Sequence, residues 1–516
     1  RDLMRSIDGR AVKAFGLRGL QLMENAGRGV ADVVLKELKA NPANCNRVAV
    51  VAGKGSNGGD GFVCARHLQN KGIPVTVFSL AKLDELSGDA AINAAVWLKS
   101  GNEFLTILGN KNLRKHVLAL RHSSIIIDAL LGTGISSPVK GIYADVIATI
   151  NKLGKKVISI DMPSGIDATT GKVLGCAVKA DITATMAMPK LGLFSFPGYF
   201  YAGRVEVIDI GVPRSVIDDA SIRWNITTGP DVSAILKPRA VESHKGSCGH
   251  LFVLAGSPGK TGAAYMCATA AMRSGAGLVT IGLPESLNDI MEVKTTEVMT
   301  LSLPESVDSK LCKASIEYII SEMEGKSAML IGPGLGASDA MYDVVREVIL
   351  SASAPLVIDA DGLNALKGRF DALKKAKAGV VLTPHPGEAG RLLGVSAKAV
   401  QDDRVGSAEK LSKLTGAVVL LKGALTVIAA PDGRVYINPT GNAGLASAGT
   451  GDVLSGMVAG LIAQGYGLTA SAVVAAYVHG AAADRLKQEA GEVGMMATDL
   501  LAVIPRVLNS LTGTAL

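Results

Sequence analysis

Ten residues near the end of the chain, 448–457, combine small, amide-rich positions with an acid and an apolar stretch. Gly449, Thr450 and Gly451 directly precede Asp452, and the apolar residues after it indicate a helix. Backbone N–H groups at a helix N-terminus bind phosphoryl groups, and a carboxylate beside them can take a proton from an attacking hydroxyl. A glycine-rich helix start with Asp in its first turn also occurs for structural reasons alone. We interpret the run as an anion site with an attached general base.

A second glycine-rich segment with an acid, GKGSNGGDG at residues 53–61, lies in the first half. Its glycines match the dinucleotide pattern GxGxxG, between an expected strand at 48–52 and a helix expected to start near Phe62. An NAD-dependent dehydrogenase would also need an acid about 20 residues further on, at the tip of the next strand. That strand ends in FSLA, and Asp84 comes late. Asp60 would repel a pyrophosphate unless it met a hydroxyl or a cation, so we expect a different nucleotide-type site.

Short β-branched runs alternate with helical patterns in the first half, which predicts a doubly wound parallel sheet. Strands are expected at 48–52, 73–80, 124–130, 157–161, 181–186 and 204–210. Ligands bind beyond the carboxyl ends of such strands, where Asp60, Asp128 and Asp161 fall. Each alone is more often a turn residue, but three at one sheet edge indicate a site. With Asn57 and Ser164 they offer oxygen ligands that suit a hard cation rather than zinc or iron.

The second half repeats the pattern of strand ends with glycine or acidic residues. A strand at 249–255 leads into GSPGKTG, which fails the Walker spacing because Leu254 stands where a glycine is needed. This segment is either a substrate-facing turn or an ordinary connection. Later strand ends carry IGPGLG, DADGLNAL, LTPHPGE and LLKG, and we expect parallel strands alternating with helices before an all-helical tail at 453–511. The prolines beside His385 hold its imidazole in one direction, although a lone histidine is more often a turn residue.

Length and composition predict two domains and exclude some partners. The 516 residues exceed one core, and the periodic pattern breaks between residues 222 and 247, so we expect domains at 1–225 and 230–516. The net charge of +7 is diffuse and aromatics are 4%, which argues against nucleic acid as a partner. No apolar run reaches the roughly 18 residues of a membrane span. Six cysteines without a CxxC pair favour a reducing, cytoplasmic location. An apolar face on the helical tail would support a homo-oligomer.

The first half resembles a known family. Its segments GKGSNGGDGFVCAR, DALLGTG and DMPSGIDATTG resemble the epimerase domain of the NAD(P)H-hydrate repair enzymes over residues 1–225, although Ser56 stands where that family usually has a second Asn. The resemblance implies potassium ligation by Asn57, Asp128 and Ser164, and a catalytic role for Asp161. It implies a substrate site formed by Ser56, Asn57, Gly58, Gly59, Asp60, Gly132, Thr133, Gly134, Ile135, Ser136, Ser137, Pro138, Tyr143 and Asp161.

The second half, with IGPGLG, DADGLNAL, LTPHPGE, LLKG and AGTGDVLSGM, resembles the NAD(P)H-hydrate dehydratase branch of the ribokinase-like family. The implied hydrate site comprises Ala263, Gly334, His385, Pro386, Gly387, Glu388, Ala389, Gly390, Arg391 and the catalytic Asp452. The implied nucleotide site comprises Lys422, Gly423, Ala424, Leu425, Thr426, Asn442, Ala443, Gly444, Leu445, Ala446, Ser447, Ala448, Gly449, Thr450 and Gly451. The phosphoryl donor is then ADP or ATP, with magnesium.

The predicted fold class is therefore α/β in two domains, an N-terminal Rossmann-like doubly wound sheet and a C-terminal ribokinase-like domain. The leading hypothesis is a bifunctional isomerase and lyase acting on hydrated NADH and NADPH. Phosphorylation would turn the hydroxyl at C6 of the hydrate into a good leaving group, and epimerisation would make both C6 epimers usable. Two alternatives remain open. The second half could be a kinase that releases a stable phosphorylated product, and the first half could be a non-catalytic binding module.

Overall fold

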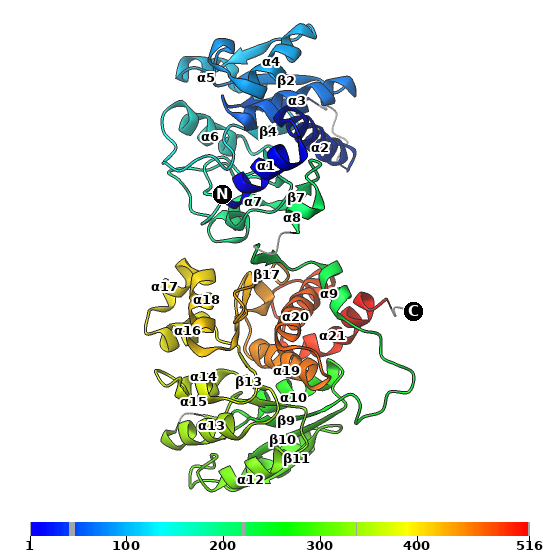
Figure 1. Cartoon of the computed structure of the whole chain (residues 1–516), viewed down its shortest axis with the longest axis vertical. Helices are drawn as coiled ribbons and strands as arrows, with labels where there is room; N and C mark the ends of the chain where they lie inside the picture. Colours follow the sequence, from blue (N-terminus) through cyan, green and yellow to red (C-terminus); the bar gives the residue numbers. More distant parts are fainter. Residues whose placement is uncertain (1, 41–46, 219–221, 337, 514–516) are drawn as a thin grey trace. The chain divides into compact units, whose positions relative to one another are not determined.

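The computed structural model describes four stretches of the chain, residues 2–40, 47–218, 222–336 and 338–513. They form two compact units, Arg1–Ile222 and Arg223–Leu516, each of which is described by itself (Figure 1). Both units are α/β, as predicted. Within the described stretches no helix combines the length and the apolar character needed to cross a membrane. Cys45 lies outside the described residues, and the other five cysteines carry free thiols.

The first unit is built on a seven-stranded, fully parallel sheet. The strands lie in the order β3-β2-β1-β4-β5-β6-β7, so the chain winds from β1 towards one edge and then from β4 towards the other. This is the Rossmann-like doubly wound arrangement that the sequence predicted. The strands are β1 (Val48–Ala52), β2 (Val75–Ser79), β3 (Phe104–Thr106), β4 (Ile125–Ala129), β5 (Lys156–Ile160), β6 (Ile182–Met186) and β7 (Arg204–Ile208).

Helices cover both faces of this sheet. Val48 and Val50 of β1 belong to a core shared with α2 and α3, whereas Ala49 and Val51 belong to a core shared with α5 and α6. Successive strand side chains point to opposite faces, so these apolar runs are buried on both sides. The helices are α1 (Asp2–Phe15), α2 (Gly19–Ala40), α3 (Ser56–Asn70), α4 (Gly88–Lys99), α5 (Asn110–Arg121), α6 (Ile142–Leu153), α7 (Gly198–Ala202) and α8 (Arg214–Ile217), with 3₁₀ turns η1 (Leu83–Glu85) and η2 (Leu191–Phe194).

Helix α3 starts earlier than the sequence predicted. It begins at Ser56 rather than near Phe62, and Gly55 is its extended N-cap residue. The N–H of Gly59 already bonds to the carbonyl of Gly55 at 3.2 Å. The acidic segment is therefore the first turn of a helix and not a loop. Its glycines are poor helix formers, which hides the start of the helix in the sequence. They are needed for packing, because a Cβ on Gly61 would lie 2.7 Å from a side chain of β4.

The second unit contains a ten-stranded sheet in the order β11-β10-β9-β12-β13-β14-β15-β16-β17-β8. Its strands are β8 (Trp224–Ile226), β9 (His250–Leu254), β10 (Leu278–Pro284), β11 (Met299–Leu303), β12 (Ala328–Ile331), β13 (Leu356–Ile358), β14 (Val380–Leu382), β15 (Val418–Leu421), β16 (Thr426–Ala429) and β17 (Val435–Asn438). The expectation of a parallel sheet is wrong for β15, β16 and β17, which pair antiparallel because short turns join them. The short edge strand β3 of the first unit was also not predicted.

Helices of the second unit also cover both faces. One core joins the sheet to α10, α19, α20 and α21, and a second joins it to α12, α13, α16 and α18. The helices are α9 (Gly229–Ile235), α10 (Thr261–Arg273), α11 (Asn288–Lys294), α12 (Ser315–Glu322), α13 (Asp339–Ser351), α14 (Ala360–Ala365), α15 (Asp371–Lys375), α16 (Pro386–Leu393), α17 (Ala397–Asp402), α18 (Arg404–Thr415), α19 (Thr450–Ala463), α20 (Leu468–Ala490) and α21 (Ala497–Leu511), with η3 (Glu285–Leu287) and η4 (Ala443–Leu445).

Glycines allow α19 to lie directly against α10. A Cβ on Gly456 would stand 2.0 Å from the carbonyl oxygen of Cys267, and one on Gly460 would stand 2.8 Å from the backbone of Ala271. Neither neighbour is the end of a flexible side chain that could move aside. The position of α19, and hence of Asp452 at its start, depends on this close approach.

We predict that Gly456→Ala lowers the free energy of unfolding of the second unit by about 1–3 kcal/mol, because the added methyl overpacks the α10–α19 contact. The measurement is urea denaturation followed by circular dichroism. Gly262→Ala is the matched control, since nothing lies within 4 Å of the new Cβ in the first turn of α10. Equal stability of the two variants would contradict the packing account.

Two candidate active sites

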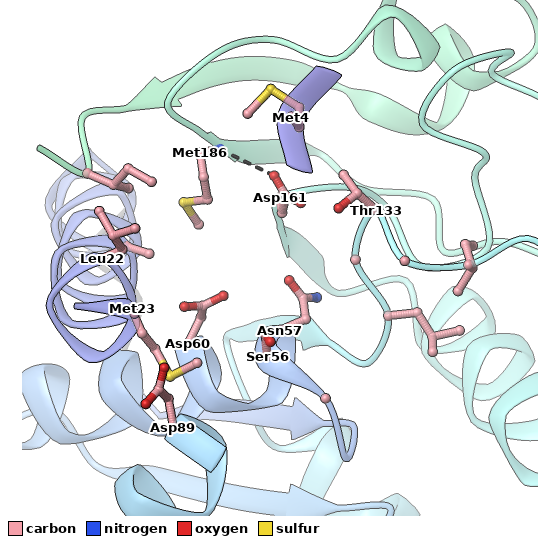
Figure 2. Close-up of a pocket in the computed structure, with 18 of the residues that line it drawn as sticks. Met4, Leu22, Met23, Ser56, Asn57, Asp60, Asp89, Thr133, Asp161 and Met186 are labelled. Carbon is pink, nitrogen blue, oxygen red and sulfur yellow. Dashed lines mark hydrogen bonds between the residues drawn. The ribbon is translucent and has the colours of Figure 1, made fainter. Parts of the chain in front are cut away.

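The first site is a cavity of about 900 Å³ in the first unit (Figure 2). Helices α1, α2 and α3, the segment after β4 and the residue after β5 contribute to its wall. Of the predicted epimerase residues, those that line it are Ser56, Asn57, Asp60, Gly132, Thr133, Gly134, Ile135, Tyr143 and Asp161. Those that do not line it are Gly58, Gly59, Ser136, Ser137 and Pro138. Met4, Leu22, Met23 and Met186 add an apolar side to the cavity.

Glycines bring the first turn of α3 to this cavity. A Cβ on Gly53 would stand 2.0 Å from the carbonyl oxygen of Leu130, and one on Gly58 would stand 1.9 Å from the carbonyl oxygen of Gly53. The segment after β1 therefore lies directly against the segment after β4. These two glycines act through backbone packing, and they place Asn57 and Asp60 at the cavity wall.

Asp161 directly follows β5 and has a left-handed backbone conformation, with φ of 66°. This conformation is costly for a residue with a side chain, and it is found most often at functional sites. Two backbone hydrogen bonds hold it, from the N–H of Asp161 to Ala184 and from that of Met162 to Ile160. The carboxylate of Asp161 is thereby turned towards the cavity (Figure 2).

Lys190 forms a buried ion pair with this carboxylate, and the sequence analysis missed it. Its Nζ lies 2.5 Å from Oδ1 of Asp161 and also donates to Thr185 and to the carbonyl of Met186. Lys190 is almost fully buried, so its charge needs these partners. The sequence signal for Lys190 was a lone lysine in the apolar segment that follows β6. From sequence alone, such a lysine cannot be distinguished from a surface lysine.

Asp60 is the second carboxyl group of the cavity. Burial raises the pKa of Asp60 well above its usual range, and the negative charge of Asp161 raises it further, while Lys190 opposes the shift. A carboxyl group in such a place keeps its proton more readily than a solvated one. The two carboxyl groups therefore differ, because Lys190 pairs with Asp161 and not with Asp60.

Asp128 and Ser164, two predicted potassium ligands, contact each other but are not among the residues that line the cavity. The hydroxyl of Ser164 donates to Asp128 at 2.6 Å, and Asp128 also accepts from the N–H of Ser164 and the hydroxyl of Ser159. All these donors are neutral, and burial raises the pKa of Asp128. Asn57 lies in the cavity wall, and among the described residues its buried Nδ2 has no hydrogen-bond partner. No contact fixes which way its amide faces, so its oxygen is available to a cation.

The second site lies at the N-terminus of α19. Gly449 is its N-cap residue in a left-handed conformation, with φ of 89°, and Asp452 occupies the first turn. Burial raises the pKa of Asp452 to about 7, and Asp359 adds to this, although Lys422 opposes it. Thr450 closes the preceding turn by donating from its hydroxyl to the carbonyls of Leu445 and Ser447. A base that titrates near neutral pH thus stands beside helix N–H groups.

Lys422 acts electrostatically on Asp452 and forms ion pairs with two further carboxylates. Its Nζ lies 2.6 Å from Oδ1 of Asp359 and 3.9 Å from Oε2 of Glu388. Burial disfavours the charged form of Lys422, but Asp359 and Glu388 outweigh it and raise its pKa. Burial also raises the pKa of Glu388. Asp359 was noted in sequence only as a strand end, and among the described residues its second oxygen has no hydrogen-bond partner.

The remaining predicted dehydratase residues fall into two groups of contacts. In the first, Gly334 packs against Lys260 and Ala263, and Lys260 pairs with Asp361 at 3.1 Å. In the second, His385 caps α16, with its Nδ1 accepting from the N–H of Gly387. The rest of α16 supplies Pro386, Ala389, Gly390 and Arg391, the last of which donates to Asn364.

The predicted nucleotide segments surround the start of α19 in two places. Asn442 donates to Asp484 of α20 and accepts from the N–H of Gly444 within η4. The segment Gly423, Ala424 and Leu425 joins β15 to β16 and has two positive φ angles, 135° at Gly423 and 54° at Leu425. Arg404, which the sequence analysis missed, donates to the carbonyls of Leu421 and Lys422 and so supports this segment.

Comparisons with known proteins agree with this division. The profile described as "YjeF-related protein N-terminus" matches residues 19–192, and that described as "NAD(P)H-hydrate dehydratase" matches residues 251–506. A bifunctional NAD(P)H-hydrate repair enzyme of Moorella thermoacetica is 42% identical over 508 residues, covering 98% of this chain and 96% of that protein. One of Escherichia coli is 32% identical, covering 98% and 93%.

A solved structure matches the second unit. The ADP/ATP-dependent NAD(P)H-hydrate dehydratase of Bacillus subtilis, co-crystallised with ATP and Mg²⁺, aligns with a TM-score of 0.50 and 34% identity over 56% of this chain and 98% of that one. The fold and the two sites define a two-domain enzyme that joins a Rossmann-like unit to a ribokinase-like unit. Within that class, the chain belongs to the family of bifunctional NAD(P)H-hydrate repair enzymes.

We predict that Lys190→Met lowers the free energy of unfolding of the first unit by about 3–5 kcal/mol at pH 7, because it leaves the partly buried Asp161 without its cation. The double variant Lys190→Met with Asp161→Asn should recover much of this loss, since no unpaired charge remains. The readout is urea denaturation. Lys36→Met, which removes an exposed lysine of the same unit, should change stability by less than about 0.5 kcal/mol. A double variant no more stable than the single one would contradict the ion-pair account.

Proposed function

We propose that this chain repairs hydrated NADH and NADPH in two steps. The first unit interconverts the R and S hydrates at C6. The second unit dehydrates the S hydrate to NAD(P)H while ADP is converted to AMP and phosphate, or ATP to ADP and phosphate. The observation that carries the proposal is Asp452, a partly buried carboxylate with a pKa of about 7 at the N-terminus of α19. The full-length relatives do not favour the alternative of a stable-product kinase with a non-catalytic first unit.

The dehydratase step uses Asp452 as the general base. It takes the proton from the C6 hydroxyl of the hydrate, and the oxygen attacks the terminal phosphorus of the nucleotide. The backbone N–H groups of residues 449–451 stabilise the charge on the transferred group. The ring nitrogen then expels phosphate, which is a much better leaving group than hydroxide, and loss of the C5 proton gives the dihydronicotinamide. Asp452 must be ionised, so activity falls as the pH drops below the pKa of about 7.

In this proposal Lys422 stabilises the negative charge of the phosphoryl group. Its raised pKa keeps it charged, and its pairing with Asp359 fixes the ammonium group beside α19, where a Cβ on Gly451 would stand 3.4 Å from Nζ. A fixed cation next to helix N–H groups favours the negative charge of a phosphoryl oxygen. Magnesium carried by the nucleotide neutralises further phosphate charge, and the unpartnered oxygen of Asp359 is a ligand of the hard type that magnesium prefers.

The epimerase step uses the cavity of the first unit. Asp161 is the proposed catalytic residue for proton transfer at C6, and the cavity-lining segments around Asn57 and Gly132 position the ring and the nucleotide. Potassium fits Asn57, Asp128 and Ser164, because a buried carboxylate with only neutral donors is compensated by a cation. Potassium there would fix the segments after β1, β4 and β5 relative to one another.

The partners, the location and the oligomeric state of the enzyme are also part of the proposal. Its partners are small molecules, namely the hydrates and the nucleotide. The free thiols of the described cysteines are consistent with a cytoplasmic location. The proposed homo-oligomer rests on the apolar character of the helical tail in the sequence, and many of those apolar residues of α19 and α20 pack into the core of the second unit.

We predict that Asp161→Asn and Asp452→Asn separate the two activities. With mixed hydrate epimers, ADP, magnesium and potassium, the native enzyme should restore the absorbance of reduced coenzyme completely. Asp452→Asn should slow recovery by about 10²–10⁴-fold, because the general base is lost. Asp161→Asn should recover the S fraction at the native rate and then slow to the spontaneous rate of epimerisation. The proposal is wrong if both variants recover all the coenzyme at the native rate.

A further inference from the structure

Three carboxyl groups line the cavity of the first unit, those of Asp60, Asp89 and Asp161. Asp60 projects from the second turn of α3, and Asp161 is the residue after β5 (Figure 2). The function proposed above gives Asp161 a catalytic role and leaves Asp60 as a substrate-binding residue only. Inversion at C6 requires the hydroxyl to leave from one face of the ring and water to enter from the other. A second carboxyl group in the same cavity can therefore transfer a proton on the second face.

The carboxylate of Asp161 pairs with a buried lysine. Its Oδ1 lies 2.5 Å from Nζ of Lys190 and accepts weakly from the N–H of Met186 at 3.4 Å. Lys190 is held in place by two further acceptors, the hydroxyl of Thr185 and the carbonyl of Met186. The contacts of this carboxylate use Oδ1, so the second carboxylate oxygen of Asp161 is available to exchange a proton.

The surroundings of Asp60 favour its protonated form. Burial and the charge of Asp161 both raise its pKa, and Met23 of α2 packs against the neighbouring Gly59 and makes this wall apolar. Lys190 is the one positive group that opposes this shift, and it is engaged with Asp161. Cys64 of α3 lies close enough to be influenced by Asp60. The other ionisable side chains that line the cavity are Lys13 of α1, Lys54 before α3, Asp89 of α4 and Tyr143 of α6.

We propose that Asp60 and Asp161 form the acid–base pair of the epimerase, with Asp60 serving one face of the ring and Asp161 the other. This inference rests on the proposed function of the first unit. In one direction Asp60 donates a proton to the departing hydroxyl, and Asp161 accepts a proton from the water that enters on the opposite face. The roles are exchanged in the other direction, so one cavity converts either epimer into the other.

The atoms balance as follows. The C6–O bond breaks while the oxygen takes the proton of Asp60 and leaves as water, and the lone pair of the ring nitrogen forms an N1=C6 double bond. A water molecule then attacks C6 from the opposite face, the N1=C6 π electrons return to nitrogen, and Asp161 takes the released proton. The hydrate is inverted at C6, and no oxidant or reductant is consumed. Proton exchange with solvent restores Asp60 and Asp161 for the next turnover in the same direction.

The test measures interconversion of separated R and S hydrates by chromatography, with potassium present and ADP omitted, so that the second unit is silent. Asp60→Asn should lower kcat by about 100-fold or more, with KM changed by less than about threefold, because the acid is lost while an isosteric polar group remains. Asp60→Glu should restore part of the rate. Asp145→Asn, which removes an exposed carboxylate of the same unit, should keep the native rate.

The pH profile separates proton transfer from simple binding. For the native enzyme, kcat/KM should fall at high pH, because Asp60 must hold its proton in the direction in which it acts as the acid. Asp60→Asn should abolish the fall at high pH. The proposal is overturned if Asp60→Asn keeps the native kcat, or if it raises KM alone with the high-pH fall intact. If the native enzyme fails to accelerate interconversion at all, the proposed epimerase function itself fails, which is a different outcome.

Discussion

Each unit of this protein contains a buried lysine that is neutralised by one aspartate at the carboxyl end of the sheet. The pairs are Lys190 with Asp161 at 2.5 Å and Lys422 with Asp359 at 2.6 Å. A buried ammonium group without a carboxylate would be very costly, so removing only the aspartate of either pair would destabilise its unit. The pairing also affects the acidity of a neighbouring carboxyl group in each site, because the lysine is already paired with another aspartate. In the second unit this group is Asp452.

Backbone packing places these charges. In both units a glycine-rich segment runs from a strand into a helix, and several of its glycines touch backbone where no side chain fits. Gly53 and Gly58 place the first turn of α3 against the segment after β4, and Gly456 places α19 against α10. The glycines therefore have two roles. They allow close packing of the helix, and they leave N–H groups and a carboxyl group accessible at its start. This shared construction explains why two different reactions use similar sequence patterns.

Much of the fold could be predicted from the sequence because local patterns determine it. The strand at residues 48–52 was predicted with its observed bounds, and the helical tail was recognised from its apolar character. The start of α3 was missed because three glycines in its first six residues hide a helix that packing stabilises. Lys190 and Asp359 were missed as site residues for a related reason. Their roles come from partners distant in sequence, and a lysine or a strand-end aspartate carries no local sign of such a partner.

The central claim is that burial and the negative charge of Asp359 raise the pKa of Asp452, although the nearby Lys422 opposes the shift. It is tested most directly by ¹³C NMR of protein labelled at the aspartate carboxyl carbons, with Asp452→Asn used to assign the signal. The account predicts a titration midpoint of about 7 for Asp452 in the ligand-free protein. It predicts a higher midpoint in Lys422→Met, because the cation that lowers this pKa is removed. A midpoint near the ordinary aspartate value of about 4, unchanged by Lys422→Met, would contradict it.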